Sequence, residues 1–124
     1  MPDIIIVEDN REIGTLLCDF LRKENYTVSL VDTGEKALQI FEQYGANLVV
    51  IDIGLPGVDG YSVCSKIRET SNAHIMIATA RDDKESTLKG LQIGADDYIC
   101  KPYDIDILTV SYTHLRAHET LANL

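Results

Sequence analysis

The chain has few cysteines and few cations, and each shortage excludes a class of protein. Cys18, Cys64 and Cys100 are odd in number and widely spaced, so they form neither a disulfide framework nor a Cys-x-x-Cys metal site, and we expect buried thiols. Eleven Lys and Arg residues stand against 20 Asp and Glu residues, a formal net charge of −9. This argues against direct nucleic-acid binding, because phosphate backbones are held by clustered cations.

Long apolar runs are also missing. No segment approaches the roughly 20 apolar residues that a membrane-spanning helix needs. The N-terminus MPDIII lacks the basic start and the small-residue cleavage site of a signal peptide. We therefore expect a cytoplasmic protein without membrane contacts. Its 124 residues can close one hydrophobic core without a metal or a disulfide, so we expect a single domain over 1–124.

What the chain does contain is an alternation of short aliphatic stretches and amphipathic stretches. The runs IIIV, LVVI and IMIA predict strands covered on both faces, whereas TVSLV alternates and predicts an edge strand. Two of the predicted helices open with a D-x-x-E capping pattern, at Asp32 and Glu35 and at Asp82 and Glu85. The predicted strands cover 3–8, 27–31, 47–52, 74–79 and 97–101; the predicted helices cover 11–24, 32–44, 59–69 and 82–93, with a last one after Pro102.

Five strand–helix units with short connections imply a parallel sheet with right-handed crossovers and helices on both faces. Five units are too few for a closed eight-stranded barrel. We therefore predict an open, doubly wound α/β fold with the first, third and fourth strands at its centre. In such sheets ligands bind at the carboxyl ends of the strands, which is where chemistry is expected.

Polar residues follow the predicted strands at that edge: Glu8 and Asp9, then Asp52, Thr79 and Lys101. Taken singly, each suits a helix cap, a solvated loop, a β-former or a surface charge. Together they point to a metal site, because converging carboxylates repel one another unless a cation lies between them. The candidate ligands are hard oxygens without His or Cys, which favours Mg²⁺, with Mn²⁺ as a substitute.

A magnesium site of this kind predicts a phosphate, because Mg²⁺ usually combines one or two carboxylates with phosphate oxygens. No Ser or Cys with a neighbouring His lies at the edge, so the nucleophile would be a carboxylate, and an aspartate can accept a phosphoryl group as an acyl phosphate. In this hypothesis Asp52 is the nucleophile and Asp9 binds the metal, with Glu8 assisting through water. Lys101 pairs with the phosphoryl oxygens, and Thr79 donates a hydrogen bond to one of them.

The motifs VED, DIGLPGVDG, ATA and GADDYICKPY resemble, in order and spacing over about 3–108, the receiver domain of bacterial two-component response regulators. The likeness is closest to regulators with a winged-helix output domain, the OmpR/PhoB type. It implies a CheY-like, flavodoxin-like (βα)5 sheet with strand order 2-1-3-4-5. It also implies that Asp52 accepts a phosphoryl group from a sensor histidine kinase, or from a small phosphodonor. Mg²⁺ would be held by Glu8, Asp9, Asp52 and the backbone carbonyl of Gly54.

The same resemblance implies a switch. Thr79 would be the switch hydroxyl and Tyr98 the switch aromatic, which fills the space that Thr79 vacates and changes the surface of the fourth helix, fifth strand and fifth helix. Without the family, Tyr98 would be interpreted as a core or edge-strand aromatic. We expect no enzymatic activity beyond self-catalysed phosphoryl transfer and dephosphorylation. Control of transcription, and any contact with promoter DNA, would belong to an output domain outside this chain.

The last 15 residues, from Val110, are atypical of the family. Ser111 and Thr113 stand where winged-helix regulators carry charges that pair with Asp96 and Asp97 across a dimer. We therefore expect a monomer or a weak, phosphorylation-dependent dimer. The segment also resembles a peptide encoded by sequencing-adapter DNA, and we expect an artefact fused in frame. His114 and His118, four residues apart without a third ligand, favour a solvated helix face over a metal site.

Two alternative functions stay open. A phosphohydrolase working through an aspartyl phosphate usually needs a second Asp two residues after the nucleophile, and Gly54 stands there. A phosphorylation-independent binding module should have lost one of the acidic or basic site residues, and none is missing. Gly54 also replaces the bulky side chain that receiver domains often have at this position, which predicts an altered lifetime of the phosphoryl group.

Overall fold

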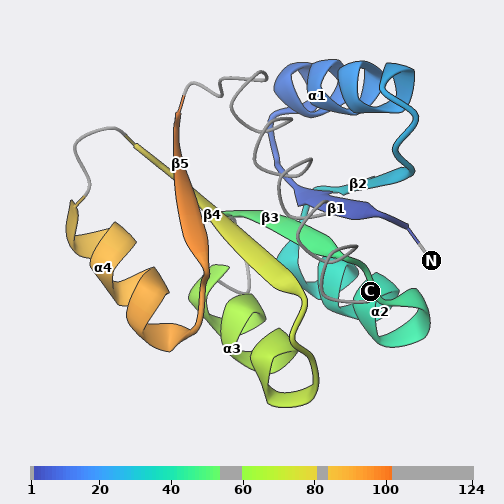
Figure 1. Ribbon diagram of the computed structural model, residues 1–124. Helices are drawn as coiled ribbons and strands as arrows, with labels where there is room; N and C mark the ends of the chain where they lie inside the picture. Colours follow the sequence, from blue (N-terminus) through green and yellow to red (C-terminus); the bar gives the residue numbers. More distant parts are fainter. Residues whose placement is uncertain (1, 54–59, 81–83, 102–124) are drawn as a thin grey trace, which may run out of the picture.

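The computed structural model describes residues 2–53, 60–80 and 84–101, with the backbone only at 79–80, 84–87, 90 and 100–101. Five parallel strands form one sheet in the order β2-β1-β3-β4-β5 (Figure 1). The predicted doubly wound α/β fold and its strand order are confirmed; the last predicted helix, after Pro102, lies outside the described residues. The elements are β1 (Ile4–Val7), α1 (Arg11–Lys23), β2 (Val28–Val31), α2 (Gly34–Tyr44), β3 (Leu48–Asp52), α3 (Gly60–Thr70), β4 (His74–Ala80), α4 (Lys84–Ile93) and β5 (Asp97–Lys101).

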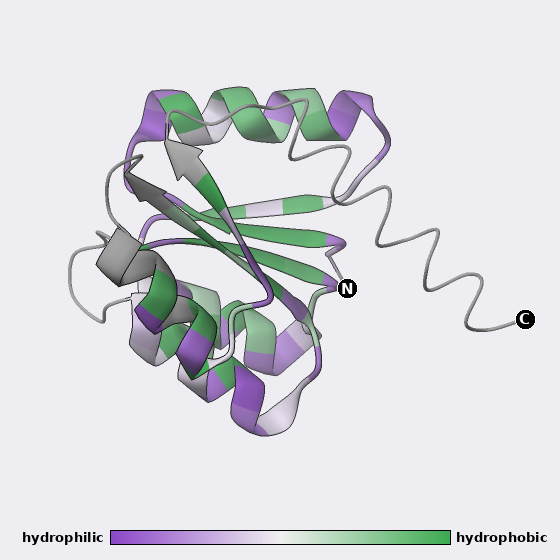
Figure 2. Cartoon of the chain, turned by 60° about the vertical axis from the view of Figure 1, so that its left-hand side comes forward, coloured by the Kyte–Doolittle hydropathy of each residue, from purple (hydrophilic) through white to green (hydrophobic). Residues whose placement is uncertain are grey.

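The sheet is buried on both faces, which explains its continuously apolar central strands. Successive side chains of a strand point to opposite faces, so Ile4 packs in a core beneath α1 while Ile5 packs in a second core against α2 and α3. Figure 2 shows the apolar central strands lying between helices on either side of the sheet. β2 lies at the edge of the sheet, as its alternating sequence predicted. No helix among the described residues is long and apolar enough to span a bilayer.

The start of α2 differs from the prediction. Thr33, not Asp32, is the N-cap: its side-chain oxygen accepts a hydrogen bond from the Lys36 backbone N–H at 3.2 Å. The prediction that Asp32 caps this helix was therefore wrong. A threonine hydroxyl caps as an aspartate does, and Thr33 is the residue directly before the first helical position. Asp32 forms an ion pair with the Lys36 ammonium at 2.9 Å instead, and this hydrogen bond lowers the pKa of Asp32. The other predicted cap, Asp82, lies outside the described residues.

Two cysteines are free and buried in the helices, as expected: Cys18 in α1 and Cys64 in α3. Burial raises the pKa of both thiols, which disfavours the reactive thiolate. We predict that iodoacetamide at pH 8 alkylates both at least about a hundredfold more slowly in the folded chain than in urea, because reaction requires local opening. Peptide mass mapping against time would measure this for each cysteine. Equal rates in the folded and unfolded chain would contradict the buried placement.

Candidate functional site

Three carboxylates meet at the carboxyl edge of the sheet. Glu8 and Asp9 directly follow β1, and Asp52 ends β3, which pairs with β1 so that Val7 lies opposite Ile51. One carboxylate oxygen from each of the three lies within 4.8 Å of the others. Glu8 and Asp52 are only 2% and 6% exposed, whereas Asp9 is exposed to solvent. The predicted convergence of these three side chains is present in the structure.

Backbone hydrogen bonds fix the Glu8 end of this cluster. The Glu8 backbone N–H donates to the Val31 carbonyl at 2.9 Å, which ties the end of β1 to the end of β2. The Glu8 Oε2 atom accepts a hydrogen bond from the Asn10 backbone N–H at 3.4 Å, and Oε1 is also buried. Asn10 in turn caps α1 by accepting from the Ile13 backbone N–H at 3.2 Å. The acidic cluster is thus set by the geometry of the strand end and of the first helical turn.

The donor set fits a hard divalent cation. All three groups are carboxylates, two are buried, and their mutual repulsion would be offset by an ion between them. Oxygen ligands of this kind suit Mg²⁺ or Mn²⁺ better than zinc or copper. The exposed position of Asp9 leaves a solvent-facing side, as expected for an ion that keeps some of its waters. Gly54, whose carbonyl was predicted as a further ligand, lies outside the described residues.

Asp52 is held on a rigid support. The β3–β4 pairing continues through Asp52 opposite Ala78, and the Ile53 backbone N–H donates to the Ala78 carbonyl at 3.2 Å. Gly60, the first residue of α3, packs directly on this strand end: a β-carbon there would lie 3.1 Å from the Asp52 carbonyl oxygen and 2.9 Å from Ile51 Cγ2. The absence of a side chain at Gly60 lets the helix approach the strand that carries the candidate phosphoacceptor.

The two remaining candidates, Thr79 and Lys101, are placed by their backbone alone. β4 and β5 pair so that Ala80 lies opposite Lys101, while Asp52 lies opposite Ala78. Both residues therefore stand at the same carboxyl edge as Asp52, on the two strands beyond it. Their side chains lie outside what the structure describes, so their roles stay predictions.

Tyr98 lies on β5, an edge strand, opposite Ile77. Its side chain is 47% exposed, so it is not a core aromatic. The Tyr98 backbone N–H donates to the Asp97 carboxylate at 2.8 Å. An outward-facing aromatic on the strand that ends at Lys101 has room to change its rotamer, which is compatible with the predicted switch role.

A hollow of about 500 Å³ adjoins the acidic cluster between the ends of β1 and β2. It gives access to the cluster from solvent. Two of its lining residues, Arg11 and Lys36, were not predicted from the sequence, and they bring positive charge to an acidic site. Their positive charges contribute to lowering the pKa of Asp32, after the hydrogen bond from Lys36. Only the meeting of β1–α1 with β2–α2 places these cations here, so no local sequence pattern signals them. The lining residues are Glu8, Asp9, Arg11, Leu30, Val31, Asp32 and Lys36.

Known proteins match this chain over most of its length. The family model of the response regulator receiver domain matches residues 4–113. The transcriptional regulatory protein BaeR of Escherichia coli O6:H1 is 44% identical over 102 residues, which is 82% of this chain and 42% of BaeR. The sensory transduction protein RegX3 of Mycobacterium tuberculosis is 40% identical over 103 residues, 83% of this chain and 45% of RegX3. The matched residues thus span less than half the length of these curated relatives.

A solved structure agrees in fold and in size. The crystal structure of the receiver domain of the TMAO respiratory system response regulator TorR superposes with a TM-score of 0.87 at 33% identity, covering 93% of this chain and 96% of that one. These matches agree with two features of this chain. Its strand order is that of the predicted receiver fold, and its acidic cluster lies at the ends of β1 and β3. The chain therefore belongs to the family of response regulator receiver domains of two-component systems.

Proposed function

We propose that this receiver domain is a phosphorylation-activated switch in which Asp52 accepts a phosphoryl group in a Mg²⁺-dependent reaction. The observation that carries the proposal is the position of Asp52: a buried carboxylate on a rigid strand, within 4.8 Å of two further carboxylates. The donor would be the phosphohistidine of a sensor histidine kinase, the usual partner of this family, or a small phosphodonor.

Each residue of the site has its own role in this phosphoryl transfer. Glu8, Asp9 and Asp52 would hold the ion, which when bound would neutralise charge on the phosphoryl oxygens. A carboxylate oxygen of Asp52 forms the new bond to phosphorus while the bond from phosphorus to the donor nitrogen or oxygen breaks, and the electron pair leaves with the donor. Lys101 pairs with the phosphoryl oxygens and Thr79 donates a hydrogen bond to one of them. Phosphoryl transfer needs little more than this positioning and charge balance.

The output of the switch would be a change in the surface of α4 and β5, with Thr79 drawn toward the phosphoryl group and Tyr98 turned inward. The curated relatives are regulators, and less than half of the length of each matches this chain. We therefore place transcription control, and any contact with promoter DNA, in an output domain beyond it. The atypical tail from Val110 lies outside the described residues. The predicted weak dimerisation concerns that tail together with Asp96 and Asp97, which the structure describes.

The test is intact mass after incubation with Mg²⁺ and acetyl phosphate. We expect the parent chain to gain one phosphoryl group, the gain to disappear in EDTA, and Asp52→Asn to show none. Asp19→Asn, which removes an exposed carboxylate from α1, is the matched control and should behave as the parent. A gain in Asp52→Asn equal to that of the parent would refute the assignment. No gain in the parent while the donor stays intact would favour the phosphorylation-independent binding module.

A further inference from the structure

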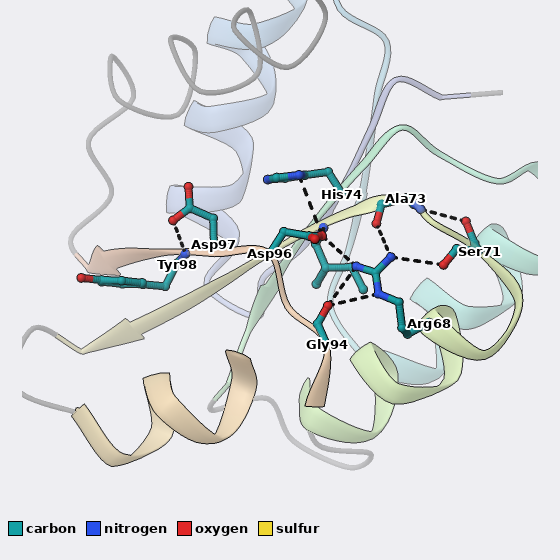
Figure 3. Close-up of polar contacts among 9 residues, drawn as sticks. Arg68, Ser71, Ala73, His74, Gly94, Asp96, Asp97 and Tyr98 are labelled. Atoms are coloured by element: carbon teal, nitrogen blue, oxygen red, sulfur yellow. Dashed lines mark hydrogen bonds and ion pairs between the residues drawn. The ribbon is translucent and has the colours of Figure 1, made fainter. Parts of the chain in front are cut away.

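The C-terminal end of α3 holds the loop that leads into β5. Arg68, in the last turn of α3, donates from Nε and Nη2 to the Gly94 carbonyl at 3.1 and 2.9 Å, and from Nη2 to the Asp96 carboxylate at 2.7 Å (Figure 3). Its Nη1 atom donates to the carbonyls of Ser71 and Ala73 at 3.2 and 2.9 Å. One guanidinium therefore joins the end of α3, the start of β4 and the segment between α4 and β5.

Asp96 completes the connection to the sheet. The carboxylate oxygen that Arg68 contacts also accepts a hydrogen bond from the Ile75 backbone N–H at 2.8 Å, and the Asp96 backbone N–H donates to the Ile75 carbonyl at 2.8 Å. The carboxylate that the family resemblance assigned to a dimer contact is thus engaged within the chain. We call this set the Arg68 clasp; it comprises Arg68, Ser71, Ala73, Ile75, Gly94 and Asp96.

The clasp has the features of a firm anchor. The Arg68 side chain is three-quarters buried, with 24% exposed. Planar guanidinium groups that bond a carboxylate and several carbonyls lose little freedom per hydrogen bond, and bonds to charged groups are stronger than neutral ones. The carbonyls of Ser71 and Gly94 follow the C-terminal ends of α3 and α4, where a cation is favourable to the helix dipole.

The described side chains of α4, the helix next to the clasp, are packed far less tightly than those of α1 and α3. On α4, Leu88 is 61% and Leu91 37% exposed, and among its described side chains only Ile93 is partly buried. α1 and α3 each bury four residues. Elements with few buried apolar groups open and move at the lowest free energy. The described part of α4 thus has the exposure that is typical of a mobile element, and it lies next to the Arg68 clasp, which is fixed.

Gly94 joins α4 to the Arg68 clasp. It follows α4 directly and has φ +134°, a conformation that residues with a side chain rarely adopt; a β-carbon there would also lie 3.2 Å from Arg68 Cγ. Hinges are residues at element ends that absorb changes in backbone angles.

We propose that the Arg68 clasp is the fixed pivot of the switch, about which α4 turns at Gly94 while Asp96 and the start of β5 stay attached to α3 and β4. Arg68 is then a positioning residue: it keeps β5 in register while α4 moves and the Tyr98 side chain turns. The pivot itself is a property of the resting chain; only its use in signalling rests on the proposed function.

Amide hydrogen exchange followed by NMR tests the pivot in the resting protein. The amides of Ile75 and Asp96 should exchange at least about tenfold more slowly than those of α4, because α4 opens without them. Addition of Mg²⁺ and acetyl phosphate, with phosphorylation verified by mass, should change the α4 rates by about threefold or more and leave Ile75 and Asp96 unchanged. Ile75 and Asp96 exchanging as fast as α4, or responding as strongly, would overturn the proposal.

Two variants test the contribution of Arg68 to these exchange rates. Arg68→Lys keeps the charge but loses the planar fork, and should speed exchange at Ile75 and Asp96 by about tenfold and extend the phosphorylation response into 94–97. Lys89→Met removes a different contact between α4 and α3, the ammonium 4.6 Å from the Tyr61 ring centre, and should leave both amides as in the parent. If the Ile75 and Asp96 amides exchange in Arg68→Lys at the same rates as in the parent, the role of Arg68 is refuted. If no phosphoryl group is gained, the proposed function fails, and the pivot is decided by the resting rates and Arg68→Lys.

Discussion

Magnesium should raise the melting temperature of the parent chain and leave the melting temperature of the Asp9→Asn variant nearly unchanged. A ligand that binds only the folded state at a hundred times its dissociation constant adds about 2.7 kcal/mol, which for a chain of this size raises the melting temperature by about 8 °C. Glu8, Asp9 and Asp52 form the acidic cluster that could hold the ion, and an amide in place of Asp9 removes one of the three charges that would attract it. Thermal unfolding at increasing Mg²⁺ concentration measures the melting temperature of the parent and of the variant.

Without metal the order of stability should reverse. Asp9→Asn removes a carboxylate that repels Glu8 and Asp52, so the variant should be slightly more stable than the parent in EDTA. The gain should not exceed about 1 kcal/mol, because Asp9 is exposed and solvent screens its charge. Asp32→Asn is the matched control: Asp32 lines the same hollow but lies outside the acidic cluster, and this variant should keep the magnesium response. A parent chain indifferent to Mg²⁺ would contradict the metal site.

Gly60→Ala should destabilise the fold and slow phosphorylation. The added β-carbon would meet Ile51 Cγ2 at 2.9 Å, the Asp52 carbonyl oxygen at 3.1 Å and Ile53 Cα at 3.2 Å. Two of these atoms belong to the backbone of the strand end and cannot swing away, so α3 or the strand must shift. Overpacking of this kind costs about 1–3 kcal/mol. Urea unfolding measures the loss, and intact mass against time with acetyl phosphate measures the slower reaction of the displaced Asp52.

Gly14→Ala is the matched control for that change. Gly14 is also a buried helical glycine, and the three atoms nearest to a β-carbon there would all belong to the Leu30 side chain, the nearest at 2.8 Å. The end of a leucine can change rotamer, and alanine inside a helix is favoured over glycine by up to about 1 kcal/mol. We expect Gly14→Ala to match or exceed the parent in stability. Equal losses in the two variants would show that backbone contact at Gly60 is not the cause.

Periodicity and connectivity along the chain are enough to predict the sheet and the position of the candidate site. Continuous aliphatic runs mark strands covered on both faces, and short connections between parallel strands leave few topologies, so β1, β3 and β4 could be placed at the centre. Because parallel strands end at one edge, Glu8, Asp9 and Asp52 could be brought together although Asp9 and Asp52 lie 43 positions apart in the sequence. These inferences need only periodicity and connectivity.

Which side chains become partners depends on how the elements pack in three dimensions. Asp32 fits a capping pattern, yet the helix begins one residue later and Thr33 caps it. Arg11 and Lys36 reach the acidic hollow because two strand–helix connections lie side by side, and Arg68 meets Asp96 across 28 residues. Such contacts depend on how helices pack on the sheet and which way each side chain points, and a pattern along the chain carries neither. The sequence therefore located the chemistry, while packing decided which groups surround and support it.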